Sequence, residues 1–305
     1  MLAGQPGPAQ GYPCRIPKVV LATVCLGLAA CGGGVLAPRG PVGHAEKMIL
    51  IDSLVIMLAI VVPTILATAA FAWWYRAGNA RSRYLPDWDY SGKVELVVWF
   101  IPALVIILLA GVTWIGSHSL DPAKPLQGTG TVEVQVVSLD WKWLFIYPQY
   151  GVASVNELTV PTRAPLHFSL TSASVMNAFF VPQLGSMIYT MNGMVTQLNL
   201  EADAAGTYEG LSANYSGAGF SDMHFDVHAV SAQEFKTWVE SARGAPRRLD
   251  EAAYLALGQQ GTSPVLVFGS TDPQLFERLV AQSLPPGPGP AAPVPDAKQP
   301  RAKAP

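Results

Sequence analysis

Two long uncharged runs dominate the pattern of apolar positions. No charged residue occurs from Ser53 to Tyr75 or from Leu96 to Gly116. Each run has about the 20 residues that a helix needs to cross ~30 Å of hydrocarbon. The first run ends in two tryptophans and a tyrosine, and Trp114 lies near the end of the second, as is typical of interface aromatics. The pattern predicts a transmembrane hairpin with spans at about 49–75 and 94–116, because buried helices of a soluble core are rarely this long.

A second pattern, with a period of two residues, follows the hairpin. Apolar residues alternate with polar ones in several short runs, which are separated by Gly, Pro and Asn. The positions that share one face in each run are Val132, Val134 and Val136; Leu166, Phe168 and Leu170; Met194, Thr196, Leu198 and Leu200; and Met223, Phe225, Val227 and Ala229. Such runs predict a β-sandwich over roughly residues 125–230.

The period then changes to that of helices. Ser231 with Glu234 three residues later forms a capping box, and apolar residues follow at helical spacing. Asp272-Pro273 marks another helix start. We therefore predict a helical appendage over residues 231–284. Eight of the 21 residues in 285–305 are proline, which predicts a disordered tail.

The N-terminus has the layout of a bacterial secretion signal. Arg15 and Lys18 precede the apolar run Val19–Leu28, which is too short to span a bilayer. Leu28-Ala29-Ala30-Cys31 resembles a lipobox, which predicts a signal peptide at 1–30 and a lipidated cysteine at position 31. An ordinary signal peptide with a chance cysteine is the alternative. Residues 31–120 would then hold a tether and the hairpin.

Charge sets the expected orientation. The loop between the spans carries Arg76, Arg81, Arg83 and Lys93, and positive charge in a short loop marks the cytoplasmic side. Both ends of the mature chain are then expected in the periplasm of a bacterial inner membrane. The composition agrees, since only 13% of residues are charged against about 25% in soluble domains. A net charge of −2 without a basic stripe argues against nucleic-acid binding.

Four segments carry a resemblance to a known family. They are Val94–Trp99 followed by Ile101-Pro102, the aromatic segment Asp140–Pro148, Ser174–Phe180, and Ser212–Met223. Together with the two-span layout, they resemble subunit II of haem-copper respiratory oxidases over roughly residues 45–280. The resemblance implies a membrane α plus all-β fold, in which the hairpin precedes a cupredoxin-like sandwich.

The copper-ligand positions of that family are changed here. Ser212 and Ser216 stand where the cytochrome c oxidases have bridging cysteines, and Asn177 and Phe220 stand for the two histidines. Only Met223 remains. Binuclear copper needs soft thiolates and imidazoles, and no cysteine occurs after residue 31. We therefore expect no metal in this domain and expect Met223 to be a core residue.

These losses resemble those of the cytochrome bo-type ubiquinol oxidases, as do the loop Tyr215–Phe220 and the lipobox. That branch implies haems and one copper in subunit I, electrons from ubiquinol, and no cofactor bound by this chain. The chain would be a non-redox subunit of a proton-pumping oxidase that reduces oxygen to water. A copper-bearing cytochrome c oxidase subunit and a free-standing cupredoxin-like lipoprotein are the alternatives.

Few other residues suggest chemistry. By resemblance, Glu95 matches an acidic residue at the mouth of a proton pathway into subunit I; the alternative is a solvated carboxylate favoured by the helix dipole. Asp52 is expected to cap the first span. His224 and His228 would lie about 13 Å apart on one face of a strand and are interpreted as surface residues. Trp141 and Trp143 are expected to pack in a core or against subunit I.

Overall fold

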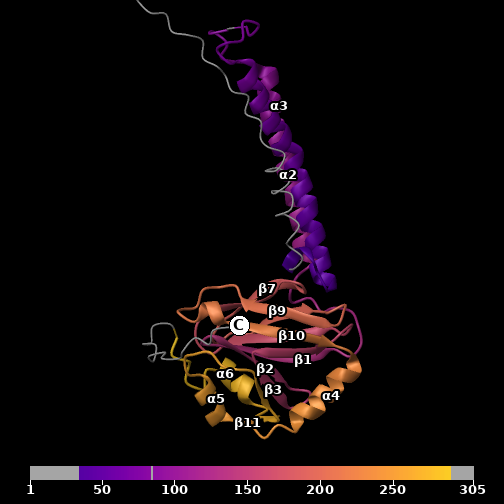
Figure 1. Ribbon diagram of the computed structural model, residues 1–305, viewed down its shortest axis with the longest axis vertical. Coiled ribbons are helices and arrows are strands. Elements are labelled where there is room, and N and C mark those ends of the chain that lie inside the picture. The colour runs from indigo at the N-terminus through magenta and orange to yellow at the C-terminus, as the bar shows by residue number, and fades with distance from the viewer. Residues whose placement is uncertain (1–33, 84, 290–305) are drawn as a thin grey trace, which may run out of the picture.

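A helical hairpin stands on a two-sheet domain in the computed structural model, which describes residues 34–83 and 85–289 (Figure 1). A short 3₁₀ turn, η2 (Gly34–Leu36), leads into α2 (Pro41–Trp74), and α3 (Gly92–Ser119) returns to the sandwich. Both helices are apolar and long enough to cross a membrane, as predicted. Helix α3 extends slightly beyond both ends of its predicted span. Helix α2 begins before its predicted span, at Pro41, which is tolerated in the first turn because a proline loses no hydrogen bond there. Asp52 therefore lies within α2, and its prediction as a cap is wrong.

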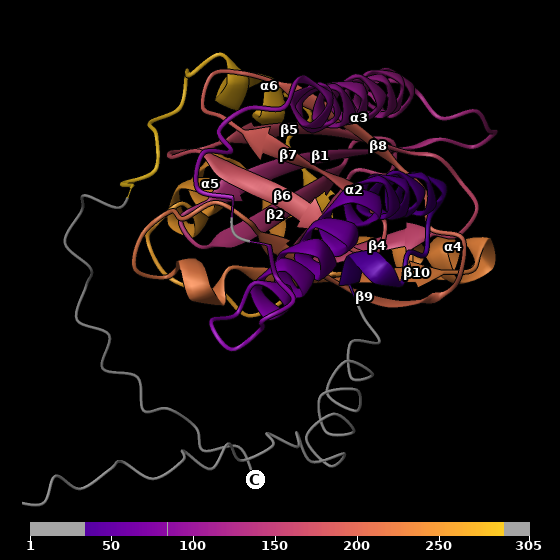
Figure 2. The same ribbon diagram turned by 90° about the horizontal axis from the view of Figure 1, so that it is seen from above.

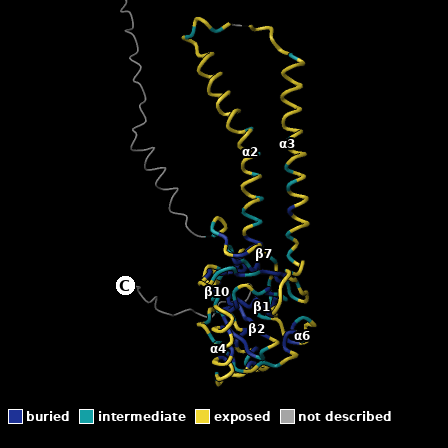
Figure 3. Tube along the Cα trace, turned by 90° about the vertical axis from the view of Figure 1, so that its right-hand side faces the viewer, coloured by how far each residue is buried: buried dark blue, intermediate teal, exposed yellow. Residues whose placement is uncertain are grey.

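The two helices are close together only near the sandwich. There the side chain of Ile49 lies over Gly116, where an added Cβ would come within 2.7 Å of the Ile49 Cδ1 atom. Towards the connecting loop, α2 leans away from α3, and nearly all of both helices is exposed (Figure 3). The hairpin thus presents its apolar surface outward, as a membrane-spanning element does.

Eleven strands form the two main sheets. They are β1 (Val132–Leu139), β2 (Lys142–Tyr147), β3 (Val152–Val155), β4 (Glu157–Pro161), β5 (Leu166–Ser172), β6 (Asn177–Val181), β7 (Gly185–Thr190), β8 (Thr196–Leu200), β9 (Gly206–Ser212), β10 (His224–Val230) and β12 (Leu266–Phe268). One sheet has the order β12-β3-β2-β1-β5-β8 and the other β4-β10-β9-β6-β7. Two parallel pairs, β1 with β5 and β4 with β10, make the topology mixed.

The inner faces of the sheets meet over a core rich in aromatic residues. Phe179 stacks on Phe225 with ring centroids 5.2 Å apart, and Trp143 meets both rings edge-on. The alternation predicted from the sequence is confirmed, since the apolar positions of β1, β5 and β10 are buried. Met194 differs: it precedes β8 in a turn and is 52% exposed.

The C-terminal region covers two parts of the sandwich. Helix α4 (Ala232–Arg243) begins with the predicted capping box, in which Ser231 and Glu234 exchange hydrogen bonds, and its Phe235 packs on Tyr150. Helices α5 (Glu251–Leu257) and α6 (Leu275–Val280) form a second core with β1, β2 and β3, on the face of the six-stranded sheet that points away from the main core. The short strand β11 (Arg248–Leu249) adds Leu249 to this core and pairs with β13 (Ser270–Thr271). The region is not helical throughout, because β12 joins the six-stranded sheet beside β3. Alternation over three residues was too short to be recognised in the sequence.

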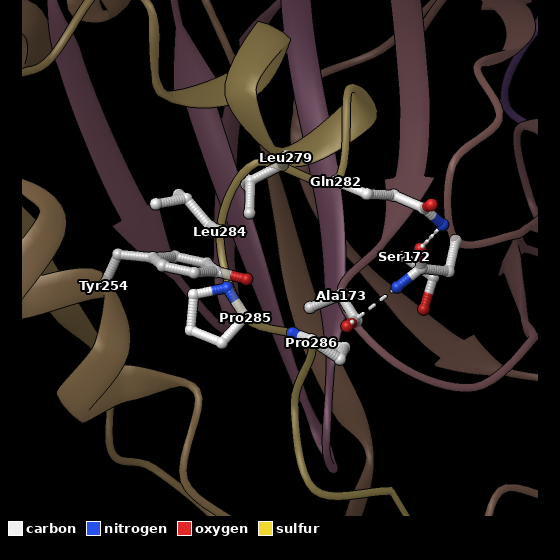
Figure 4. A pocket seen from close by; sticks show the side chains of 9 residues that line it. Ser172, Ala173, Tyr254, Leu279, Gln282, Leu284, Pro285 and Pro286 are labelled. Carbon is white, nitrogen blue, oxygen red and sulfur yellow. Dashed lines mark hydrogen bonds between the residues drawn. The ribbon is translucent and has the colours of Figure 1, made fainter.

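The first residues of the proline-rich tail are ordered by contacts with the sandwich. The amide of Gly287 donates to the Ala173 carbonyl at 2.9 Å, and the amide of Gly289 donates to Asp140 Oδ2 at 2.8 Å. Together with Tyr254, Pro285 and Pro286 line a cavity of about 280 Å³ beside the second core (Figure 4). The prediction of disorder from residue 285 is therefore wrong for 285–289, since glycines between the prolines supply the amides that dock the chain. Residues 290–305 lie outside the described residues.

Seen from above, α2 and α3 lie over the sandwich (Figure 2), and the start of α2 and the chain after α3 are hydrogen-bonded to it. The amide of Gly43 in α2 donates to the Leu184 carbonyl at 3.0 Å, and Val42 is buried in the main core. Next to them, Ser186 of β7 donates to Glu46 at 2.5 Å. The chain after α3 is held at β8, where Asn199 donates to the Pro122 carbonyl. The hairpin and the sandwich therefore meet at a defined junction.

Candidate functional site: the former ligand loop and the hairpin end

The sandwich brings the predicted ligand positions together at one end of its five-stranded sheet. Strand β9 ends at Ser212, and the chain then forms a loop that closes through the 3₁₀ turn η3 (Phe220–Asp222) before β10 begins. We call residues 212–223 the former ligand loop. The Ser212 amide donates to the Met223 carbonyl at 3.2 Å, and the Ala213 amide donates to the Ala178 carbonyl of β6 at 3.0 Å. The loop is thereby fixed at both ends and lies beside the start of β6, where Asn177 is found.

Polar groups within this loop bond to one another. The Ser212 hydroxyl donates to Asn177 Oδ1 at 3.2 Å and also lies 3.3 Å from the Asn214 carbonyl. The Ser216 hydroxyl lies 4.0 Å from the sulfur of Met223, which is 1% exposed. Asn177, Ser212, Ser216 and Met223 are thus brought together, and Met223 is the core residue that the sequence predicted. All four are buried.

Phe220 is placed differently from its neighbours in the loop. Its ring lies edge-on to Tyr215, with centroids 5.7 Å apart, and it is half-buried. Tyr215 itself is 75% exposed. An aromatic pair therefore covers the outside of the loop at the position where copper-bearing relatives are expected to carry an imidazole.

Trp141 supports the loop from below. It occupies the tight turn between β1 and β2 with φ of +66°, a left-handed conformation that is unfavourable for a bulky residue. Its indole N–H donates to the Ser216 carbonyl at 3.2 Å, and its ring lies so close to Gly219 that an added Cβ would approach to 2.3 Å. Trp141 and Trp143 lie in the same core, as predicted, and Trp141 also packs against this loop.

The donor set at this site does not fit a binuclear copper centre. It consists of two hydroxyls, one amide and one thioether, whereas such a centre needs bridging thiolates and imidazoles. Histidines elsewhere do not replace them: His224 and His228 lie on β10 and pair with Glu209 and Glu157, respectively. Within residues 34–83 and 85–289, no three His, Cys, Asp or Glu side chains gather as metal ligands would.

Glu95 lies at the opposite end of the molecule. It is in the first turn of α3, where its amide donates to the Ser91 carbonyl at 3.0 Å, and its side chain is exposed. A carboxylate there interacts favourably with the positive end of the helix dipole. The structure thus places Glu95 at the loop end of the hairpin, as the sequence predicted. Cys31 lies outside the described residues.

Sequence reasoning missed a buried charged pair beneath the former ligand loop. Asp140 and Lys142 flank Trp141, and both are at most 5% exposed. The Lys142 ammonium donates to the carbonyls of Leu257 and Gln259 at the end of α5, while Asp140 accepts from Ser174 and Gly289. Burial lowers the pKa of Lys142, and the nearby Asp140 carboxylate opposes that shift. Two charges inside an otherwise aromatic segment were the signal for this pair.

Residues 149–230 match the family model for the periplasmic domain of cytochrome c oxidase subunit II. The ubiquinol oxidase subunit 2 of Acetobacter aceti is 48% identical over 88% of this chain and 88% of its own length. The cytochrome bo(3) ubiquinol oxidase subunit 2 of Pseudomonas aeruginosa is 45% identical over 84% of this chain and 78% of its own.

Among solved structures, the periplasmic domain of cytochrome oxidase subunit II from Bradyrhizobium japonicum is 25% identical, with a TM-score of 0.36. That match covers 37% of this chain and 94% of the solved one. The hairpin, the sandwich and the former ligand loop define a subunit of the oxidase subunit II class. Given its identity to full-length relatives, the chain belongs to the ubiquinol oxidase subunit 2 family.

Proposed function

We propose that this chain acts as a non-redox subunit of a proton-pumping ubiquinol oxidase, beside a subunit I that holds the haems and the remaining copper. The observation that carries the proposal is the ligand loop, where Ser212 bonds to Asn177 and Ser216 faces Met223. Of the four side chains brought together here, only the Met223 thioether is a soft donor, and it cannot replace the bridging thiolates and imidazoles of an electron-transferring copper centre. Electrons from ubiquinol would then reach subunit I within the membrane without passing through the sandwich.

The metal part of the proposal has a direct test. Copper is added to the purified full-length chain, and absorbance and bound metal are measured after desalting. We expect no purple chromophore and no stoichiometric binding. Tight binding of copper with such a chromophore would contradict the proposal and favour the cytochrome c alternative.

Glu95 supplies the second part of the proposal, which is proton entry. An ionisable side chain that is enclosed at the margin of a membrane has a high free-energy cost, and such residues commonly have a function. Glu95 is exposed at the end of a hairpin whose flanking surface is apolar, so a partner helix of subunit I packed there would enclose it. We propose that its carboxylate takes up protons from the cytoplasm and passes them towards the oxygen-reducing site.

Substitution of Glu95 tests that role. Glu95→Ala is expected to slow quinol oxidase turnover about tenfold, equivalent to ~1.4 kcal/mol in the barrier. Glu95→Asp should retain more activity because it preserves an ionisable carboxyl at nearly the same depth. Asp89→Ala removes the same charge from an exposed position in the same loop and serves as the control. If Glu95→Ala turns over at the wild-type rate, in complexes of equal haem content, Glu95 has no role in proton entry and this chain acts only as a scaffold.

The remaining proposals concern processing and location. Cys31 is proposed to be the lipidated first residue of the mature chain in the inner membrane, with both ends of the chain in the periplasm. Intact mass measurement of the membrane form should show loss of residues 1–30 and a gain of acyl mass. Detection of residues 1–30 on the mature protein would refute this processing. Cys31→Ser should block processing but leave the chain anchored, because α2 and α3 are long and apolar enough to hold it in the membrane without the acyl chains.

A further inference from the structure

The loop end of the hairpin contains a cavity with a volume of about 760 Å³. It lies between the C-terminal end of α2 and the start of α3, where the helices have separated (Figure 3). Its lining residues are Phe71, Tyr75, Ser82, Arg83, Leu85, Trp88 and Val94. A volume of this size is typical of pockets that hold organic ligands, and most of the lining is apolar.

The hollow exists because the two ends of the hairpin are packed differently. Gly116 lets Ile49 approach α3 near the sandwich, whereas bulky aromatic residues occupy the opposite end. Phe71 and Trp88 are 63% and 61% exposed, so they do not fill the space between the helices. An apolar hollow at the margin of a bilayer holds water poorly and can take up an apolar group from outside the chain.

Charge at the mouth of the hollow indicates what that occupant is. The loop from Arg76 to Lys93 contains four basic residues and two acidic ones, Asp87 and Asp89, so its net charge is positive. The guanidinium of Arg76 is already engaged, because it lies 4.9 Å from the Trp73 ring centroid and donates to the Trp73 carbonyl. Among the described residues, Arg83 has no hydrogen bond or ion pair, although it lines the hollow. Its guanidinium is therefore available to an anion at the depth of the lipid headgroups.

We infer that this hollow binds an anionic phospholipid. Arg83 would hold the phosphate, which a planar guanidinium can bind through two parallel hydrogen bonds. An acyl chain would lie along Phe71, Leu85 and Val94. Trp88 would lie at the interface, where tryptophan is enriched. The inference rests on the hairpin spanning a bilayer and is independent of the proposed role of Glu95.

The test measures lipid binding to the intact oxidase complex by native mass spectrometry. The complex is purified with this chain in place, stripped of loosely held lipid and titrated with phosphatidylglycerol or phosphatidylcholine. Arg83→Gln is expected to weaken phosphatidylglycerol binding about tenfold, the effect of one charge-assisted hydrogen bond. Arg81→Gln is the matched control, because it removes the same charge from the same loop but does not line the hollow. It should change binding less than twofold.

A second variant separates the headgroup from the acyl chain. Val94→Phe adds volume inside the hollow, leaves all arginines in place and should also weaken phosphatidylglycerol binding. Equal binding by wild type and Arg83→Gln would overturn the inference, as would an equal loss in Arg81→Gln, which would indicate diffuse attraction. Phosphatidylcholine binding as tight as that of phosphatidylglycerol would exclude an anionic site, and no bound lipid in the wild-type complex would mean that a protein partner fills the hollow. Glu95→Ala should leave lipid binding unchanged, which keeps this test separate from that of proton entry.

Discussion

The former ligand loop and the loop end of the hairpin differ in how many of their polar and charged side chains find a partner within the chain. In the ligand loop, Ser212 bonds to Asn177, and Trp141 donates to the Ser216 carbonyl. At the hairpin end, Glu95 is exposed and Arg83 lines an open hollow. The first region is closed by its own residues, whereas the second leaves charge and apolar surface for something outside the chain. The contrast supports the proposal that this subunit acts through its hairpin.

The closed region should be sensitive to loss of volume. Phe179 is fully buried among Trp143, Phe168 and Phe225, so Phe179→Ala is expected to lower the free energy of unfolding of the sandwich by about 3–5 kcal/mol. Phe100→Ala, at a residue that is 63% exposed on α3, should change it by less than about 0.5 kcal/mol. Urea unfolding of the full chain in detergent, followed by near-UV circular dichroism, measures both. Similar losses in the two variants would mean that the regions are not packed as differently as described.

A smaller effect is expected from pH. Burial, reinforced by the negative charge of Asp140, raises the pKa of Tyr254 to about 12, while an unfolded tyrosine ionises near 10. Between these values the unfolded chain loses a proton that the folded chain keeps. The contribution of Tyr254 to the free energy of unfolding is therefore fully present below pH 10 and is lost as pH rises towards 12. Tyr254 should account for about 2 kcal/mol of that loss.

Tyr254→Phe has no proton to lose and should show a shallower fall in stability over the same range. Urea unfolding of both proteins at pH 9, 10, 11 and 12 measures the difference. Parallel curves for wild type and Tyr254→Phe would show that the phenol is not shielded in the second core.

The sequence predicted the parts of the fold that depend on local pattern. The uncharged runs predicted both helices, and the alternation in β1, β5 and β10 predicted buried strands because a sandwich face repeats every two residues. The ligand positions could be placed at one site because a known motif fixes their spacing. The capping box at Ser231 predicted the start of α4 to the residue.

What the sequence could not predict depends on contacts between distant segments. The hydrogen bond from Lys142 to the end of α5 joins residues more than 100 positions apart. The amides of Gly287 and Gly289 are bound by Ala173, which follows β5, and by Asp140, which follows β1. Proline content says nothing of these distant acceptors, so the prediction of disorder was wrong for 285–289. The hollow at Arg83 arises from the divergence of two helices, which periodicity does not report.

We propose that the function of this chain depends on the hairpin end and not on the former ligand loop. The most direct test compares ubiquinol oxidase turnover, at equal haem content, in wild type, Glu95→Ala and the double variant Ser212→Ala/Ser216→Ala. We predict turnover about tenfold slower for Glu95→Ala, or ~1.4 kcal/mol, and wild-type turnover for the double variant. The opposite outcome, with Glu95→Ala unaffected and the serine variant slowed, would contradict the account.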